Sequence, residues 1–303
     1  MGGLNMDDKT KKRITEQRNQ NTYQIDELQT ADVLKIINQE DKKVAESVNK
    51  IISKIKQVID QIAPRMKKGG RLFYVGAGTS GRLGILDAVE CKPTFSVSPE
   101  RVVGILAGGE KAMFRSQEDI EDNAELGAEK IRSYKLSPHD SVIGIAASGK
   151  TPFVIGAVEA ARKEGAFTAA LVCNNDSPLA AAADKEMAVI VGPEVVTGST
   201  RMKAGTAQKM ILNMISTAVM IKQGKVYSNL MVDLQPSNEK LRNRAIDIFT
   251  IITAAEEEIA AEYLKKTDYE LKEAVVMYEK GVELEKAREL LATNDGILKK
   301  VIN

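Results

Sequence analysis

Short apolar runs alternate with helical patterns through the middle of the chain, from Arg71 to about Gly224. The runs are apolar at nearly every position, which indicates strands that are covered on both faces, as in a parallel sheet. They read RLFYVG, VVGILA, SVIGIA, TAALVC and MAVIV and start at residues 71, 102, 141, 168 and 187. This alternation predicts a doubly wound α/β sandwich with a mainly parallel sheet of five strands.

Helical spacing predicts the remaining elements. Within the sheet region we expect helices at 81–91, ended by Pro93, and at 112–133, 152–164, 178–184 and 200–223. Residues 30–62 fit one long helix or two, ended by Pro64 and the pair Gly69-Gly70. A helix is expected over 236–252, followed by three short helical patterns broken near residues 267, 281 and 295. The expected division is an N-terminal helical segment (1–64), an α/β domain (65–235) and C-terminal helices with a small helical bundle (236–303).

Composition narrows the chemistry. The 303 residues include 43 Lys and Arg against 42 Asp and Glu, a net charge of +1, so nothing favours nucleic acid or a membrane surface as partner. Two cysteines and one histidine exclude a disulfide framework and a zinc site of the usual kind. The polar start shows no signal peptide, and we expect a cytoplasmic protein. Its chemistry must therefore use carboxylates, hydroxyls, lysines, arginines and backbone amides.

The first glycine-rich corner, GAGTSG, follows a predicted strand and opens a helix. It matches the dinucleotide pattern GxGxxG, but no suitable acidic residue follows about twenty positions on, near Ser98. Thr79 and Ser80 add hydroxyls beside the backbone amide of Gly78, which suits a phosphate monoester. A dinucleotide is the weaker alternative at this corner.

The second corner, GIAASGKT, satisfies the P-loop pattern GxxxxGK[ST] letter for letter. Gly144 falls inside an apolar run, however, so the loop holds only residues 147–150, and Pro152 starts the next helix. Such a loop is too short to wrap a β-phosphate, and nucleotide triphosphate binding is again the weaker alternative. Ser148, Gly149 and Thr151 are candidates for binding a phosphate at a helix N-terminus.

The third corner, TGSTRMKAGT, opens the long helix expected over 200–223. Ser199 and Thr200 are hydroxyl candidates, while Arg201 and Lys203 place cations where the helix dipole opposes them. A nearby anion would relieve that conflict, and an anionic ligand bound at this corner would supply it.

These motifs resemble a known family. GAGTSGR, LDAVEC, AASGKTPF and TGSTRMKAGTAQK, preceded by TEQRN near Thr15, closely resemble the N-acetylmuramic acid 6-phosphate etherases, which belong to the sugar isomerase (SIS) fold class and are related to the glucokinase regulatory protein. The resemblance implies lyase activity that gives N-acetylglucosamine 6-phosphate and D-lactate in cell-wall amino-sugar recycling. It also implies a homodimer, with the long N-terminal helix as an interface element, and no metal or other cofactor.

The resemblance also selects two acids that spacing alone cannot separate from the other 40. It assigns Glu90 and Glu121 as the catalytic acid–base pair, with Glu90 protonating the leaving group. It places the phosphate at Thr79, Ser80, Ser148 and Thr151. A phosphosugar-binding regulator without turnover is the alternative, although such regulators carry two SIS domains in a longer chain.

Overall fold

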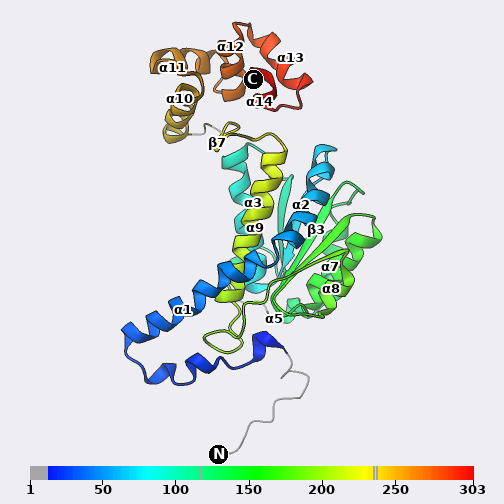
Figure 1. Ribbon diagram of the computed structural model, residues 1–303. Helices are drawn as coiled ribbons and strands as arrows, with labels where there is room; N and C mark the ends of the chain where they lie inside the picture. Colours follow the sequence, from blue (N-terminus) through cyan, green and yellow to red (C-terminus); the bar gives the residue numbers. More distant parts are fainter. Residues whose placement is uncertain (1–12, 116–117, 235, 237) are drawn as a thin grey trace, which may run out of the picture. The chain divides into compact units, whose positions relative to one another are not determined.

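The computed structural model describes residues 13–115, 118–234, 236 and 238–303 (Figure 1). Its main sheet has the strand order β2-β1-β3-β4-β5, and all four neighbouring pairs are parallel. The strands are β1 (Leu72–Gly76), β2 (Val102–Leu106), β3 (Ser141–Ala146), β4 (Phe167–Val172) and β5 (Lys185–Ala188). The predicted five-stranded parallel sheet is confirmed, although β5 begins two residues before the expected position.

The chain divides into two compact units. The first comprises the residues up to Ala88 together with Glu100–Ile215, and the second comprises Val89–Pro99 and Ser216–Asn303. The sheet and the three glycine-rich corners belong to the first unit. The helices α3 (Gly78–Phe95) and α9 (Lys203–Lys222) cross from one unit into the other within their own length.

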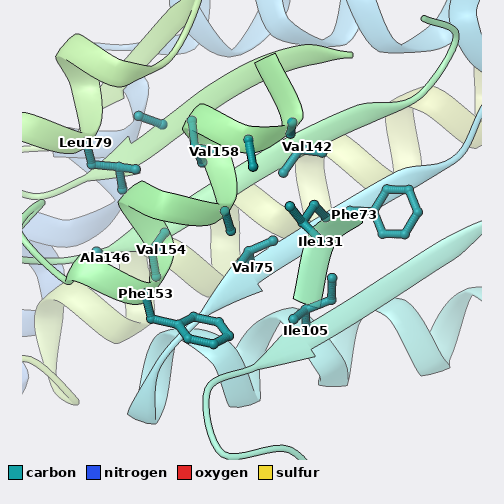
Figure 2. Packing of buried hydrophobic residues seen from close by; sticks show 14 of the residues in the cluster. Phe73, Val75, Ile105, Ile131, Val142, Ala146, Phe153, Val154, Val158 and Leu179 are labelled. Carbon is teal, nitrogen blue, oxygen red and sulfur yellow. The ribbon is translucent and has the colours of Figure 1, made fainter. Parts of the chain in front are cut away.

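The core of the first unit lies between the sheet and the helices α6 (Ala124–Arg132) and α7 (Pro152–Lys163). Phe73 and Val75 of β1 point into it beside Ile131 of α6 and Val154 of α7 (Figure 2). The strands β1, β3 and β4 are buried along their whole length, which explains their continuous apolar runs. The short α8 (Pro178–Ala182) completes this layer, while α2 (Ile52–Lys67) contacts β4 and β5.

Two prolines that were expected to end helices lie inside them. Pro64 is in the last turn of α2, and Pro93 is in the last turn of α3. Each proline removes its own backbone hydrogen bond, and the helix nevertheless continues for two or three more residues. Gly69, with a φ of +89°, ends the first of these segments, as expected for that glycine pair. The apolar stretch before it forms two helices, α1 (Thr30–Asn49) and α2.

The single helix predicted over 112–133 is wrong. The described residues of this stretch form α4 (Lys111–Phe114), α5 (Glu118–Glu121) and α6. The side chain of Asn123 accepts a hydrogen bond from the Leu126 amide and so starts α6 as a separate helix. This break leaves Glu121 at the end of a short helix, where the prediction had placed it in the middle of a long one.

Besides the ends of α3 and α9, the described residues of the second unit form a hairpin, β6 (Val226–Tyr227) and β7 (Leu230–Met231), and further helices. They are α10 (Glu239–Thr253), α11 (Glu257–Lys266), α12 (Leu271–Lys280), α13 (Leu284–Thr293) and α14 (Leu298–Ile302). The expected breaks between α11 and α14 are confirmed. Lys272 donates to the Asp233 carboxylate and the Gly296 carbonyl, which joins the hairpin to the helices. Among the described residues, no helix is long and apolar enough to cross a membrane.

Candidate functional site

The first corner is shaped by glycines that bring α3 close to β1. A Cβ on Gly76 would lie 2.6 Å from the Gly81 amide nitrogen, and a Cβ on Gly81 would lie 2.5 Å from the Gly76 carbonyl oxygen. The two outer glycines of GxGxxG therefore have a packing role. Gly78, with a φ of +50°, is exposed at the turn. The buried Ser80 hydroxyl donates to Gln208 of α9 over 2.9 Å, so it already has a partner within the protein.

The second corner is a tight loop between β3 and α7. Gly144 lies within β3, as expected, and Thr151 and Pro152 occupy the N-cap and first position of α7. Gly149 has a φ of +66°, and a Cβ there would lie 2.3 Å from Cβ of Ser177. Ser148 and Thr151 are half-buried on either side of it. The loop thus holds two hydroxyls beside the amides of a helix N-terminus.

The third corner contains its own anion. The Glu194 carboxylate accepts hydrogen bonds from the backbone amides of Lys203 and Ala204, both over 2.9 Å, at the first residues of α9. Burial raises the pKa of Glu194. The conflict between basic residues and the helix dipole is therefore relieved by this side chain and by Glu40, which pairs with the buried Lys203 ammonium.

The other candidates at the third corner remain accessible. Arg201 is exposed, and Ser199 and Thr200 are half-buried. A Cβ on Gly205 would lie 3.4 Å from the methyl carbon of Thr79, so the start of α9 passes close to the first corner. The start of α9 thus lies beside the first corner, while the Lys203 ammonium is engaged with Glu40.

One residue outside the predicted set, Asn174, shapes the same edge of the sheet. Asn174, directly after β4, accepts from the Ile14 amide over 2.9 Å and donates to the Thr15 hydroxyl and the Ala147 carbonyl, both over 3.0 Å. This side chain fastens the N-terminal segment to the second corner. A cavity of about 560 Å³ lies there and is lined by Arg13, Ile14, Ser148, Lys150, Asn174, Asn175, Asp176 and Ser177.

The two predicted catalytic acids lie on different helices. Glu90 is exposed on α3 and belongs to the second unit, whereas Glu121 is half-buried at the end of α5 in the first unit. Along α3, Glu90 comes twelve residues after Gly78, a rise of about 18 Å. Within the part of the chain that the structure describes, no three His, Cys, Asp or Glu side chains gather as a metal site.

Comparison with known proteins defines the class first. Residues 50–162 match the glucokinase regulatory protein N-terminal SIS domain, and residues 123–218 match the SIS domain. A phosphosugar isomerase involved in capsule formation from Bacteroides fragilis shares the fold, with a TM-score of 0.50 and 19% identity over 65% of this chain and 94% of that one. The α/β protein is thus an SIS-domain protein.

Nearly full-length relatives define the family. N-acetylmuramic acid 6-phosphate etherase of Caldanaerobacter subterraneus subsp. tengcongensis is 56% identical over 95% of this chain and 94% of the relative. The corresponding proteins of Enterococcus faecalis and Bacillus subtilis are 52% and 51% identical, each over 95% of this chain and 96% and 95% of their own lengths. The chain belongs to the N-acetylmuramic acid 6-phosphate etherase family, which are carbon–oxygen lyases.

Proposed function

We propose that this etherase cleaves the D-lactyl ether at C3 of N-acetylmuramic acid 6-phosphate with Glu90 and Glu121 as its acid–base pair. The observation that carries the activity is identity above 50% to etherases over 95% of the chain. The products are N-acetylglucosamine 6-phosphate and D-lactate. The choice of acids is supported by their position in motifs that resemble those of the family.

The reaction proceeds by elimination and water addition. In the open-chain sugar, the C1 aldehyde acidifies the hydrogen on C2, and the Glu121 carboxylate removes it. The C3–O bond breaks as the C2–C3 double bond forms, and protonated Glu90 gives its proton to the lactyl oxygen. Water then adds to C3 and loses a proton to Glu90, while Glu121 returns its proton to C2. Both acids end in their starting states.

The phosphate is held away from the reacting carbons. Thr79, Ser148 and Thr151 present hydroxyls beside the amides of Gly78 and Gly149, with Ser80 behind them and Ser199, Thr200 and Arg201 at the adjoining corner. Charge-assisted hydrogen bonds of this kind fix the sugar against the acids. Binding at the phosphate thereby holds C2 and C3 beside the acids.

A homodimer is part of the proposal. Leu86 and Val89 of α3 are 47% and 57% exposed, and Leu34 of α1 is 60% exposed, which supports association through these helices. Sedimentation that shows only monomers would contradict the dimer.

The partner of the protein is thus a small sugar phosphate, and we place the reaction in the cytoplasm, with no nucleic acid or membrane partner.

Glu90→Gln and Glu121→Gln test the assignment of the acids. Each should lower kcat by about 10²- to 10⁴-fold, because one proton transfer loses its catalyst. Glu125→Gln is the matched control, since this exposed acid follows Glu121 closely and pairs with Arg132 on the surface of α6. It should retain full activity. Wild-type rates in both Glu90→Gln and Glu121→Gln would refute the assignment.

A further inference from the structure

The cavity beside the second corner carries more positive than negative charge. Its lining includes the side chains of Arg13 and Lys150 as cations and of Asp176 as the one acid, together with four polar residues. It opens at the carboxyl ends of β3 and β4, where parallel α/β sheets bind their ligands. Ser148 belongs both to this lining and to the proposed phosphate site, so the two adjoin.

Asn174 builds the wall that carries Arg13. Its carbonyl oxygen accepts from the Ile14 amide at 2.9 Å and from the Thr15 amide at 3.4 Å, while its NH2 group donates to Thr15 and to the Ala147 carbonyl. All the hydrogen-bonding capacity of this buried amide is used. The segment around Arg13 is therefore held in place before any ligand binds.

The Arg13 guanidinium has one donor without a partner. Within residues 13–115, 118–234, 236 and 238–303, its buried Nε–H has no hydrogen-bond partner. A buried donor without a partner is costly, so the hydrogen-bonding capacity of this guanidinium is not fully used within the protein. The planar fork of a guanidinium matches the two oxygens of a carboxylate.

The substrate of the proposed reaction has two anionic groups, namely the phosphate on C6 and the carboxylate of the lactyl ether on C3. We propose that this cavity is the subsite for the lactyl carboxylate, with Arg13 as its bidentate partner and Lys150 as a second cation. The inference rests on the proposed function. It explains how an SIS fold that holds a sugar phosphate also orients a carboxylate-bearing leaving group toward its acid.

The test compares two substrates in three proteins. The substrates are N-acetylmuramic acid 6-phosphate and its lactyl methyl ester, which lacks the negative charge on the leaving arm. The proteins are the wild type, Arg13→Gln and Arg18→Gln. Arg18 is a matched control on the same segment, because its guanidinium stacks over the Tyr23 ring at 4.2 Å and lies outside this cavity. The readout is N-acetylglucosamine 6-phosphate, which both substrates release.

Arg13→Gln should lower kcat/KM for the acid by roughly 10- to 100-fold, the worth of a hydrogen-bonded charge pair. The wild type should turn over the ester with a kcat/KM lower than that for the acid by a similar factor. Arg13→Gln should then change kcat/KM for the ester by less than about 3-fold, because the ester already lacks the interaction. Arg18→Gln should follow the wild type with both substrates. Arg13→Lys, which keeps the charge but not the fork, should fall between the two.

Two results would overturn the subsite. One is unchanged turnover of the acid by Arg13→Gln; the other is an equal loss with acid and ester, which would indicate a contact with the phosphate or a structural role. Melting temperatures of all variants establish that they are folded. A folded wild type that releases no product from the acid would instead refute the proposed function, and the subsite with it.

Discussion

The Lys203 ammonium lies 2.6 Å from Oε2 of Glu40, and the two side chains are only 1% and 3% exposed. Glu40 also accepts hydrogen bonds from Lys43 and from Asn21, the latter over 3.0 Å. This pair joins the middle of α1 to the first residue of α9. It thereby supports the corner at which the hydroxyls of Ser199 and Thr200 lie.

Glu40→Ala should lower the free energy of unfolding by about 3–5 kcal/mol, because it leaves the Lys203 ammonium buried without a counter-ion. Urea denaturation measures this directly. Asp32→Ala is the control on the same helix, since the exposed pair of Asp32 with Lys35 contributes at most about 1 kcal/mol. Equal effects of the two substitutions would mean that the buried pair contributes no more to stability than an exposed pair.

The Glu40 carboxylate also makes the stability of the folded state depend on pH. Burial by itself raises the pKa of Glu40, but hydrogen bonds from Lys203, Lys43 and Asn21 outweigh it and lower the pKa from 4.5 to about 2. A lowered pKa in the folded state gives stability that is present above pH 4.5 and is lost as the pH falls toward 2.

The stability difference between the wild type and Glu40→Gln isolates this effect. It should be largest near pH 6 and shrink between about pH 5 and pH 2.5. Asp140, whose pKa Arg71 lowers against the effect of burial, titrates in both proteins and cancels from the difference. Urea unfolding of both proteins at four pH values measures this stability difference. A difference that stays constant over this range would contradict the assigned titration of Glu40.

Gly149→Ala should lower the free energy of unfolding by more than the strain of an alanine in a left-handed backbone conformation. Its Cβ would meet Ser177 at 2.3 Å, whereas Gly109, with a similar φ of +61°, has open space within 4 Å. Gly109→Ala should cost about 1 kcal/mol of backbone strain, and Gly149→Ala should cost more because the loop must move. Urea unfolding of both proteins gives the comparison. Equal costs would show that the contact with Ser177 is not tight.

Thr151→Ala should raise KM for the sugar phosphate by roughly 10-fold while kcat stays within a few-fold, because one hydrogen bond to a charged group is lost away from the reacting carbons. Initial rates over a range of substrate concentrations separate the two constants. Ser133→Ala, which removes an exposed hydroxyl bonded to the Lys130 carbonyl, should leave both unchanged. An unchanged KM in Thr151→Ala would remove Thr151 from the phosphate site.

The sheet could be predicted because its signal is local. Each buried strand is a continuous apolar run, and each strand–helix corner carries glycine, serine or threonine within a few residues. The prolines misled the prediction of helix ends, since Pro64 and Pro93 lie within the last turns of α2 and α3 and do not end them. The break before α6 depended on one capping side chain, Asn123.

The residues that shape the site are harder to predict because their partners are distant in sequence. Asn174 contacts Ile14 across 160 positions, and Lys203 contacts Glu40 across 163. No local pattern encodes such pairs. Glu194 stands closer to the helix that it caps, but it lies nine residues before Lys203, outside the usual N-cap position. Glu90 and Glu121 could be selected only through the family resemblance.

The release of D-lactate by the purified protein tests the central claim most directly. N-acetylmuramic acid 6-phosphate is the substrate, the unphosphorylated sugar is the control, and EDTA is present throughout. We predict release of D-lactate and N-acetylglucosamine 6-phosphate in equal amounts from the phosphorylated sugar, and none from the control. A folded protein that binds the phosphorylated sugar and releases no D-lactate would contradict the account.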